Sequence, residues 1–390
     1  MAIKYIDQIN LQGKSVVIRV DYNVPYDKEM KITDDTRISA TIPTLEYCIK
    51  NNAKVILISH LGRPDGKVVP KMSLKPVTER LSSLIGKEVQ FITETIGQES
   101  LNAVKKLKGG DIALLENIRF YPEEEKNDAE FGKKLAAMGD VYIDDAFATA
   151  HRGHASNEAI TKHIKECGAG FLLKDEIEYF KKITSNPERP LLAVIGGAKI
   201  STKLDVLKNL LNKVDYLIIG GGMAFTFLKA KGYNIGKSLL EKELIDNAKE
   251  ILKIGGDKIL LPVDVVIASE FKNDSTASIV DIDKIPDNMI GLDIGPKSIE
   301  EFGKIIKKVK TAVWNGPMGA FEMPAFAEGT VTIGKLISEC KTSIVGGGDS
   351  VTAVNDNGLA DKMSYISTGG GAFLELLEGK TLPGVAALDK

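Results

Sequence analysis

The chain has 390 residues, of which 27% are charged, and its formal net charge at pH 7 is −2. This length exceeds what one hydrophobic core normally supports and predicts two domains. The near-neutral charge excludes the strongly basic surface that nucleic acids or acidic membranes require, so we expect neither kind of partner.

Cysteine usage and the first residues bear on the cellular compartment. Cys48, Cys167 and Cys340 are widely spaced and form no C-x-x-C pair, which is typical of a protein in a reducing compartment. The opening MAIKYIDQIN lacks the pattern of a secretory signal peptide, and no apolar run is long enough to span a bilayer. We therefore expect a soluble, cytoplasmic protein.

Short β-branched apolar runs recur along the whole chain and predict buried parallel strands. They begin at Val16, Val55, Ile112, Val141, Leu191, Tyr216, Ala312, Ser343 and Ser364. Helical periodicity lies between them, for example from Leu240 to Ile251. Alternation of strand and helix indicates the α/β class, with two doubly wound, Rossmann-like parallel-sheet domains.

One amphipathic segment near the middle of the chain predicts a helical hinge. In FLLKDEIEYFKKIT, from Phe171 to Thr184, apolar residues recur at helical spacing, and Asn186-Pro187 ends the pattern. We expect a linker helix over residues 173–186, with one domain over 1–172 and the other over 187–370.

The residue types differ on the two sides of this linker. All seven arginines and all four histidines lie at or before Arg189, whereas 25 of the 37 glycines follow it. Guanidinium groups suit small anions, and glycine lets backbone N–H groups approach a polyphosphate closely. The first half therefore predicts a site for a small acid, and the second half predicts a nucleotide site.

In the first half, polar residues fall in or just after the ends of the predicted strands, where α/β proteins bind ligands. They are Asp21, Asn23, Arg37, His60, Arg63, Arg119, His151, Arg152 and His154. Each alone is common in loops as a helix cap or a surface charge. Together, several arginines in one crevice would select a small molecule with two negative charges.

Two pairs in this half admit other interpretations. His151 and His154 have a spacing that zinc ligands use, but the arginine between them disfavours a cation. Asp144 and Asp145 resemble a paired-carboxylate site, yet adjacent strand residues face opposite ways. Helix capping or orientation of an arginine is the simpler role for these aspartates.

Three glycine-rich turns follow strands in the second half. Gly196-Gly197-Ala198-Lys199 opens a predicted helix, on which Lys199 and Lys203 would share a face near the positive N-terminus. The segment GGGDS from Gly346 adds Asp349, which suits Mg²⁺, and Gly369 to Gly371 forms the third turn. Three such turns favour a phosphate cradle over tight connections alone.

Standard nucleotide fingerprints are missing. The segment from Gly232 to Ser238 is one residue too short between its glycines for a Walker A motif and follows no predicted strand. No G-x-G-x-x-G occurs, which disfavours a dinucleotide oxidoreductase.

Nine ordered motifs give the chain a resemblance to the phosphoglycerate kinase family over nearly its whole length. They are RVDYNVP from Arg19, TDDTRI from Thr33, SHLGRPDG from Ser59, ENIRFYPEEEKND from Glu116, DAFATAHRGHAS from Asp145, GGAKIS from Gly196, VWNGPMGAFE from Val313, GGGDS from Gly346 and STGGGAFLELLEGKTLPGV from Ser367.

The resemblance implies Mg²⁺-dependent phosphoryl transfer from 1,3-bisphosphoglycerate to ADP, giving 3-phosphoglycerate and ATP, by a monomer. It implies that the acid is held by Asp21, Asn23, Arg37, His60, Arg63, Arg119 and Arg152. It implies that the nucleotide is held by Gly197, Lys199, Lys203, Gly291, Asn315, Glu322, Gly347, Gly348, Asp349 and Ser350, with Asp349 at the metal. It also implies that the tail over 371–390 packs back on the first domain.

The chemistry of this reaction assigns the catalytic groups. The acceptor is an ionised carboxylate or phosphate, so no general base is needed. Catalysis then requires alignment and neutralisation of the moving phosphoryl group, which we assign to Arg37, Lys199 and the amides of Gly370 and Gly371. The alternatives are an anion-binding protein that closes without chemistry and, less favoured, a nucleotide-dependent oxidoreductase.

Overall fold

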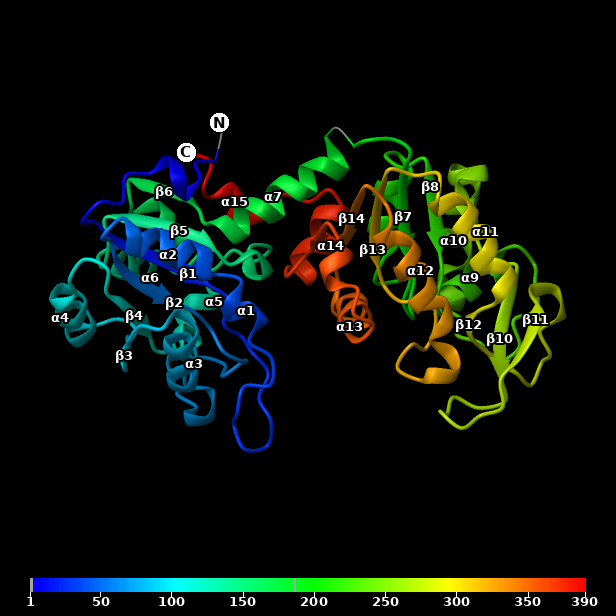
Figure 1. Ribbon diagram of the computed structural model, residues 1–390, viewed down its shortest axis with the longest axis horizontal. Coiled ribbons are helices and arrows are strands. Elements are labelled where there is room, and N and C mark those ends of the chain that lie inside the picture. The colour runs from blue at the N-terminus through cyan, green and yellow to red at the C-terminus, as the bar shows by residue number, and fades with distance from the viewer. Residues whose placement is uncertain (1–2, 186) are drawn as a thin grey trace. The chain divides into compact units, whose positions relative to one another are not determined.

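The computed structural model describes residues 3–185 and 187–390. Residues 1, 2 and 186 lie outside the described residues. Residue 186 is the last position of the predicted linker and the first residue of its predicted terminator. The chain divides into two compact units (Figure 1). Unit 1 is Met1–Glu178 with Thr381–Lys390, and unit 2 is Tyr179–Lys380.

Unit 1 is built on a parallel sheet of six strands in the order β3-β4-β2-β1-β5-β6. Its strands are β1 (Ser15–Val20), β2 (Lys54–Ile58), β3 (Val89–Ile92), β4 (Ile112–Leu115), β5 (Val141–Asp145) and β6 (Glu166–Ala169). Its helices are α1 (Thr36–Ser39), α2 (Ile42–Lys50), α3 (Lys75–Ile85), α4 (Gln98–Lys106), α5 (Pro122–Glu125), α6 (Ala129–Ala136), the start of α7 (Phe171–Thr184) and α15 (Pro383–Ala386).

Both faces of this sheet are covered. In β1, Val16, Val17 and Ile18 are all buried, although neighbouring strand residues point to opposite faces. On one face, Val16 and Ile18 pack with the apolar stripes of α2 and α3, which include Leu45 and Leu81. A sheet buried on both faces requires the continuous apolar runs seen in the sequence.

Unit 2 contains a second six-stranded parallel sheet, in the order β15-β14-β13-β7-β8-β9. Its strands are β7 (Leu191–Ile195), β8 (Tyr216–Ile219), β9 (Ile259–Leu260), β13 (Thr311–Asn315), β14 (Thr342–Val345) and β15 (Tyr365–Ile366). Its helices, besides the end of α7, are α8 (Leu204–Leu211), α9 (Ala224–Ala230), α10 (Ile245–Gly255), α11 (Pro296–Ile306), α12 (Glu328–Ser338), α13 (Gly348–Asp356) and α14 (Gly371–Leu377). All nine strands predicted from the sequence are present, and the α/β class with two parallel sheets is confirmed.

Unit 2 also has a small antiparallel sheet that the sequence analysis missed. Its strands β10 (Asp264–Ala268), β11 (Ser278–Asp281) and β12 (Ile290–Ile294) pair in the order β11-β10-β12. Strand β11 is largely exposed, so it lacks the apolar run that marks a buried strand. The helix predicted over Leu240–Ile251 begins later, at Ile245, after a 3-10 turn over Lys242–Leu244.

Helix α7 has the predicted range Phe171–Thr184, and the division between the units falls within it. Its start is fixed in unit 1, because Thr44 Oγ1 accepts the Phe171 N–H at 2.9 Å and Asp145 Oδ1 accepts the Leu173 N–H at 3.1 Å. Further along, the Tyr179 ring stacks on Tyr365, which lies in β15. The division therefore lies inside the predicted linker rather than at its ends.

The C-terminal tail joins unit 1 at Thr381, not near Gly371 as predicted. Helix α14 belongs to unit 2, where the Asn209 side chain donates to the Leu377 carbonyl. The last residues bind unit 1 through backbone and side chain: Gly384 N–H donates to the Ala150 carbonyl at 2.9 Å, and the Lys390 ammonium donates to the Ile164 carbonyl.

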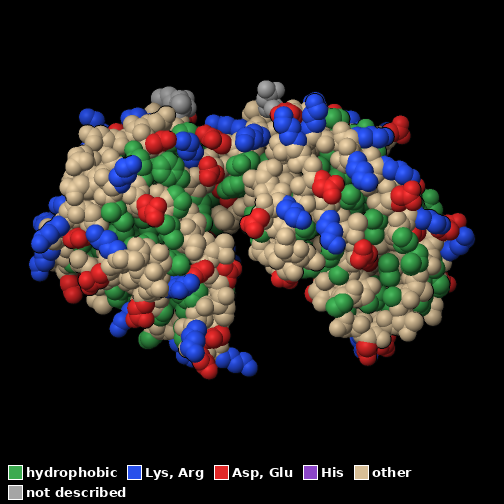
Figure 2. Space-filling model, viewed as in Figure 1, with side chains coloured by type: hydrophobic (Ala, Val, Ile, Leu, Met, Phe, Trp, Pro, Cys, Tyr) green, Lys and Arg blue, Asp and Glu red, His purple; other side chains and the backbone are tan. Residues whose placement is uncertain are grey.

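Charges of both signs are interspersed over the face shown in Figure 2, as the net charge of −2 predicts. Among the described helices, we find none with both the length and the apolar character needed to cross a membrane.

Asp145 gives the first testable prediction. Burial, with a smaller contribution from the neighbouring Asp144, raises the pKa of Asp145 to about 7, against the opposing effect of hydrogen bonds from Thr44 and Leu173. A carboxyl whose folded pKa lies above its unfolded value near 4 destabilises the fold as the pH rises, because the unfolded chain ionises first. Asp145→Asn keeps an accepting oxygen for Leu173 and cannot ionise. In urea unfolding at pH 8 we expect it to be more stable than the wild type by on the order of 2 kcal/mol.

This difference in unfolding free energy should shrink as the pH falls from 8 towards 4 and level off below 4, because the wild-type carboxyl is protonated in both states only below both of its pKa values. A variant that is less stable than the wild type at pH 8 would show that the charge at Asp145 supports the α7 cap.

Candidate active site

In each unit the polar residues gather where the strand order reverses. The chain leaves β1 towards β2 on one side and leaves β5 towards β6 on the other, so a crevice opens outside the carboxyl ends of β1 and β5. In unit 2 the same reversal lies between β7 and β13. The two candidate sites occupy these two positions.

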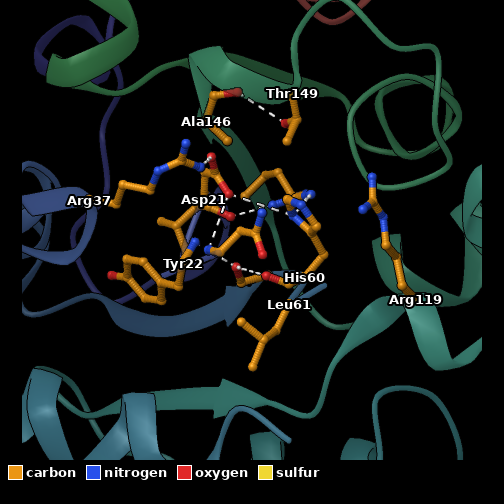
Figure 3. Close-up of polar contacts among 12 residues, drawn as sticks. Asp21, Tyr22, Arg37, His60, Leu61, Arg119, Ala146 and Thr149 are labelled. Atoms are coloured by element: carbon orange, nitrogen blue, oxygen red, sulfur yellow. Dashed lines mark hydrogen bonds and ion pairs between the residues drawn. The ribbon is translucent and has the colours of Figure 1, made fainter. Parts of the chain in front are cut away.

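The first site, here called the basic site, follows β1 and centres on Asp21 (Figure 3). The Asp21 carboxylate forms an ion pair with Arg37 on one side and lies 3.7 Å from His60 Nδ1 on the other. Asn23 joins it, because its side-chain oxygen accepts the Gly62 N–H at 2.9 Å. The structure thus brings together these four predicted residues from three separate loops.

Arg19 belongs to the basic site and was missed by the sequence analysis. It lies within β1, is only 1% exposed, and donates from Nε to Ser156 Oγ at 2.8 Å and from Nη2 to His60 Nδ1 at 3.2 Å. Ser156 Oγ in turn donates to the fully buried Glu124 at 2.6 Å. An arginine inside the apolar run VVIRV was the available signal, because a buried guanidinium needs dedicated partners.

His60 is neutral and its tautomer is fixed. Burial lowers the pKa of His60 well below its ordinary value, and the charges of Arg19, Arg119, Arg152 and Arg37 lower it further. Since Arg19 can only donate, His60 Nδ1 accepts, and the proton is left on Nε2. The same crowding by guanidinium groups, after burial, lowers the pKa of His154 to about 3. Four guanidinium groups therefore act on the neutral His60, and three of them also act on the neutral His154, an environment that favours an anion.

Arg119 is a buried member of the basic site whose hydrogen-bonding groups are only partly paired (Figure 3). It is 4% exposed, donates from Nη1 to the Gly62 carbonyl at 2.9 Å, and lies 3.2 Å through Nε from Glu125. Its Nη2 is buried and makes no hydrogen bond. A buried guanidinium nitrogen without an acceptor is costly and is satisfied by an anion.

The remaining predicted members are less constrained. Arg152 donates from Nε to His151 Nε2 at 3.1 Å, and its charge reaches both His60 and His154. Arg63 is exposed. Of the two aspartates at the end of β5, Asp145 acts as the simpler interpretation predicts, because it caps α7. Asp144 Oδ1 instead accepts the Ala146 N–H at 2.9 Å.

The second site consists of two cavities in unit 2 that share Asp349. The first, here called the glycine-rich cavity, has a volume of about 310 Å³. It is lined by Lys203, Asn315, Gly316, Gly347, Gly348, Asp349, Ser350, Gly370, Gly371 and Leu374. Gly348, Asp349 and Ser350 form the first turn of α13, whose N–H groups have no partner within the helix. This end of the cavity therefore attracts negative charge.

Lys203 supplies a positive charge to the glycine-rich cavity. Its ammonium donates to Asn315 Oδ1, and Asn315 Nδ2 donates to the Gly346 carbonyl at 2.6 Å. Burial lowers the pKa of Lys203 to about 8, although Asp349 and Glu378 oppose the shift. The hydroxyl oxygen of Ser350 is occupied, because it accepts the Gly316 N–H at 2.6 Å.

The prediction that Lys199 and Lys203 share a helix face is wrong. Helix α8 begins only at Leu204, and Lys199 is an exposed loop residue that lines neither cavity. The loop is held by other contacts: Gly197 has φ +106° and donates its N–H to the Pro317 carbonyl at 3.0 Å. These contacts delay the start of the helix.

The second cavity, here called the apolar cavity, has a volume of about 360 Å³ and was not predicted. Of the predicted residues, it is lined by Gly197, Gly291, Glu322 and Asp349. Much of the remaining wall is apolar and includes Phe225, Leu239, Phe271, Met318 and Phe321. An apolar cavity that opens beside a phosphate-binding helix start fits a flat, uncharged ring linked to an anion.

The Walker-like segment from Gly232 to Ser238 binds backbone rather than ligand. Ser238 Oγ accepts the Gly291 N–H at 2.9 Å, and Lys237 N–H donates to the Met289 carbonyl at 2.8 Å. The segment follows α9, not a strand, as the sequence analysis argued.

The residues of the glycine-rich cavity fit a magnesium ion that takes one carboxylate from the protein and most of its other oxygens from phosphates and water. Asp349 is an exposed carboxylate in the same cavity as Lys203. Within the described residues, we find no cluster of three His, Cys, Asp or Glu that could hold a metal by itself. Mg²⁺ typically binds proteins through one or two carboxylates and takes its other oxygens from phosphates and water.

Comparison with known proteins agrees with this geometry. The family model described as phosphoglycerate kinase matches residues 6–380. The cytosolic phosphoglycerate kinase 3 of Arabidopsis thaliana is 53% identical over 99% of this chain and 98% of its own length. The phosphoglycerate kinase of Geotalea daltonii is also 53% identical, over 100% of this chain and 99% of its own. The solved structure of phosphoglycerate kinase from Coxiella burnetii is 42% identical and superposes with a TM-score of 0.92, covering 100% of this chain and 99% of that one.

Proposed function

Because the chain belongs to the phosphoglycerate kinase family, we propose a role for each of its two sites in the reaction of that family. The protein is a glycolytic kinase that transfers a phosphoryl group reversibly between 1,3-bisphosphoglycerate and ADP, with 3-phosphoglycerate and ATP as the other pair. The basic site holds the acid, and the two cavities of unit 2 hold the nucleotide.

Arg119 carries the assignment of the basic site. Its buried Nη2 lacks an acceptor, and its charge adds to those of Arg19, Arg37 and Arg152 around the neutral His60. A phosphate or carboxylate oxygen would supply that acceptor and offset the mutual repulsion of the guanidinium groups. His60 would donate from Nε2 to the same ligand. Asp21, Asn23 and Arg63 complete the proposed acid site.

The apolar cavity is the proposed nucleoside site, and the glycine-rich cavity is the proposed phosphate site. Glu322 lines the apolar cavity, where its carboxylate suits the ribose hydroxyls. Lys203, Asn315 and the first-turn amides of α13 face the phosphates, with Gly197, Gly291, Gly347, Gly348 and Ser350 shaping the walls. Lys199 stays in the proposal as an exposed loop lysine able to reach a phosphate.

Asp349 is the proposed metal ligand. Asp349 would hold a Mg²⁺ ion, which would supply positive charge to offset part of the charge of the phosphates. Because Asp349 lines both cavities, its carboxylate suits the position where the nucleoside meets its phosphates.

The reaction needs no general base, because the acceptor oxygen is already ionised at neutral pH. The side chains therefore act by alignment and by neutralising charge on the moving phosphoryl group. We assign that role to Arg37 in unit 1 and to Lys199 with the amides of Gly370 and Gly371 in unit 2. Substrates held by different units must be brought together for transfer, and water must be excluded from the acyl phosphate.

We further propose that the protein acts as a monomer in the cytoplasm. Similar relatives include proteins named cytosolic from Nicotiana tabacum and Triticum aestivum.

The assignment as a whole is tested by turnover. With 3-phosphoglycerate, ATP and Mg²⁺, we expect ADP to be formed at a rate that depends on all three components. An assay with NADH in place of ATP is the control for redox activity. ATP consumption that does not require 3-phosphoglycerate would contradict the proposal.

Arg37→Ala tests the catalytic role of the basic site. Loss of one transition-state donor should lower kcat by about 100-fold or more while the KM for the nucleotide changes little. Arg189→Ala is the matched control, because it removes another guanidinium. Arg189 lies just before β7 and pairs with Asp215, just before β8, at the amino ends of these strands and away from both sites. A normal kcat in Arg37→Ala would refute the role.

Lys203 predicts a pH dependence of nucleotide binding. With its pKa lowered to about 8, Lys203 carries its charge below pH 8 and loses it as the pH rises further. Calorimetric titration should therefore show ADP affinity falling between pH 7 and pH 9.5. Lys203→Arg keeps its charge over this range, so its affinity, whatever its value at pH 7, should stay flat. An equally steep decline in the variant would assign the effect to another group.

A further inference from the structure

A buried carboxylate in the wall of the apolar cavity has no role in the proposed function. Asp293 lies on β12, is 3% exposed, and lines the cavity together with Gly319 and Glu322. Carboxylates are rarely buried without dedicated partners, so the contacts of this group carry information about its purpose.

Asp293 joins a strand to a helix start. Its Oδ2 accepts the N–H of Gly329, in the first turn of α12, at 2.7 Å, and its Oδ1 accepts the N–H of Ile294 at 2.9 Å. Each oxygen thus satisfies one backbone donor. The positive end of α12 favours negative charge at this place, whereas burial raises the pKa of Asp293 to about 7.

The loop that carries Glu322 packs against the same carboxylate. A Cβ on Gly319 would lie 2.3 Å from Asp293 Oδ1, so only glycine allows the loop this close. The loop is tied on both sides, because Ala320 N–H donates to the Leu292 carbonyl at 2.8 Å and Met318 N–H donates to Thr330 Oγ1 at 3.0 Å. Asp293 therefore fills the junction between β12, the start of α12 and the loop over 316–322.

From this geometry we propose that Asp293 is a positioning residue for nucleotide binding. It holds the loop over 316–322 at the distance that shapes the apolar cavity and presents Glu322. The inference rests on the proposed function, since it requires that this cavity hold the nucleoside.

Asp293→Asn tests the inference with little change of volume. An amide has one accepting oxygen where the carboxylate uses two, so either Gly329 or Ile294 loses its acceptor. Loss of a buried hydrogen bond to a charged group should raise the KM for ATP by roughly tenfold, while the KM for 3-phosphoglycerate stays within about twofold of the wild type.

Asp264→Asn is the matched control. Asp264 is also buried, lies in the same antiparallel sheet, and accepts the N–H groups of Lys297 and Ser298 at the start of α11, at 3.0 and 2.8 Å. It lines neither cavity. We expect this variant to unfold at a lower urea concentration than the wild type with its KM for ATP unchanged.

Gly319→Ala provides a second variant that keeps the buried carboxylate. Its Cβ forces the loop and Asp293 apart, so the KM for ATP should rise here too, even if Asp293→Asn fails to fold. A normal KM for ATP in folded Asp293→Asn or Gly319→Ala would overturn the inference. An equal rise in Asp264→Asn would also overturn it, because the effect would then be general loosening.

Glu322→Ala separates this inference from the proposed function. If Glu322→Ala raises the KM for ATP and Asp293→Asn does not, only the positioning role of Asp293 is wrong. If neither variant changes the KM for ATP, the assignment of the apolar cavity to the nucleoside is wrong as well.

Discussion

Parallel strand pairing is the constraint on which both sites depend. In each of the two six-stranded sheets, the connection between consecutive strands returns the chain from the carboxyl end of one strand to the amino end of the next. Loops therefore collect at the carboxyl ends of the strands. Where the strand order reverses, two neighbouring loops leave in opposite directions and a crevice results. In unit 1 the reversal brings the loop after β1 beside the end of β5, and in unit 2 it brings Gly196 beside Asn315.

The basic site concentrates positive charge, and the fold offsets part of it. The basic site holds four guanidinium groups that repel one another, those of Arg19, Arg37, Arg119 and Arg152. The fold keeps His60 neutral and buries the carboxyl group of Glu124 near these arginines. Burial raises the pKa of Glu124, and the charge of Arg19 and the hydrogen bonds from Ser156 offset part of this rise. The fold thus compensates part of the positive charge of the basic site.

The sequence predicted the parts of the fold that have a strong local signal. All nine apolar runs are strands, and α7 has the predicted range, because a strand buried on both faces and a helix with one apolar face each have a distinct pattern. Of the antiparallel sheet, β11 was missed because it is largely exposed and lacks a buried apolar run. The shared helix face of Lys199 and Lys203 was wrong because tertiary contacts of Gly197 hold the loop open. The apolar cavity has no signature in one segment, since its walls come from many parts of unit 2.

Glycines in this chain also make room for buried carboxyl groups of the protein, in addition to their proposed role in phosphate binding. Three buried aspartates cap helices α7, α11 and α12, and each faces a glycine whose Cβ would lie 2.3 Å from a carboxyl atom. The pairs are Asp145 with Gly170, Asp264 with Gly295, and Asp293 with Gly319. A buried carboxylate that accepts backbone N–H groups must approach the main chain as closely as a bound phosphate does, and the same absence of a side chain makes room for either. Part of the glycine surplus in unit 2 therefore accommodates anions that belong to the protein itself. Only the Asp293 pair also borders a cavity, which is why the same capping device can reach the ligand there.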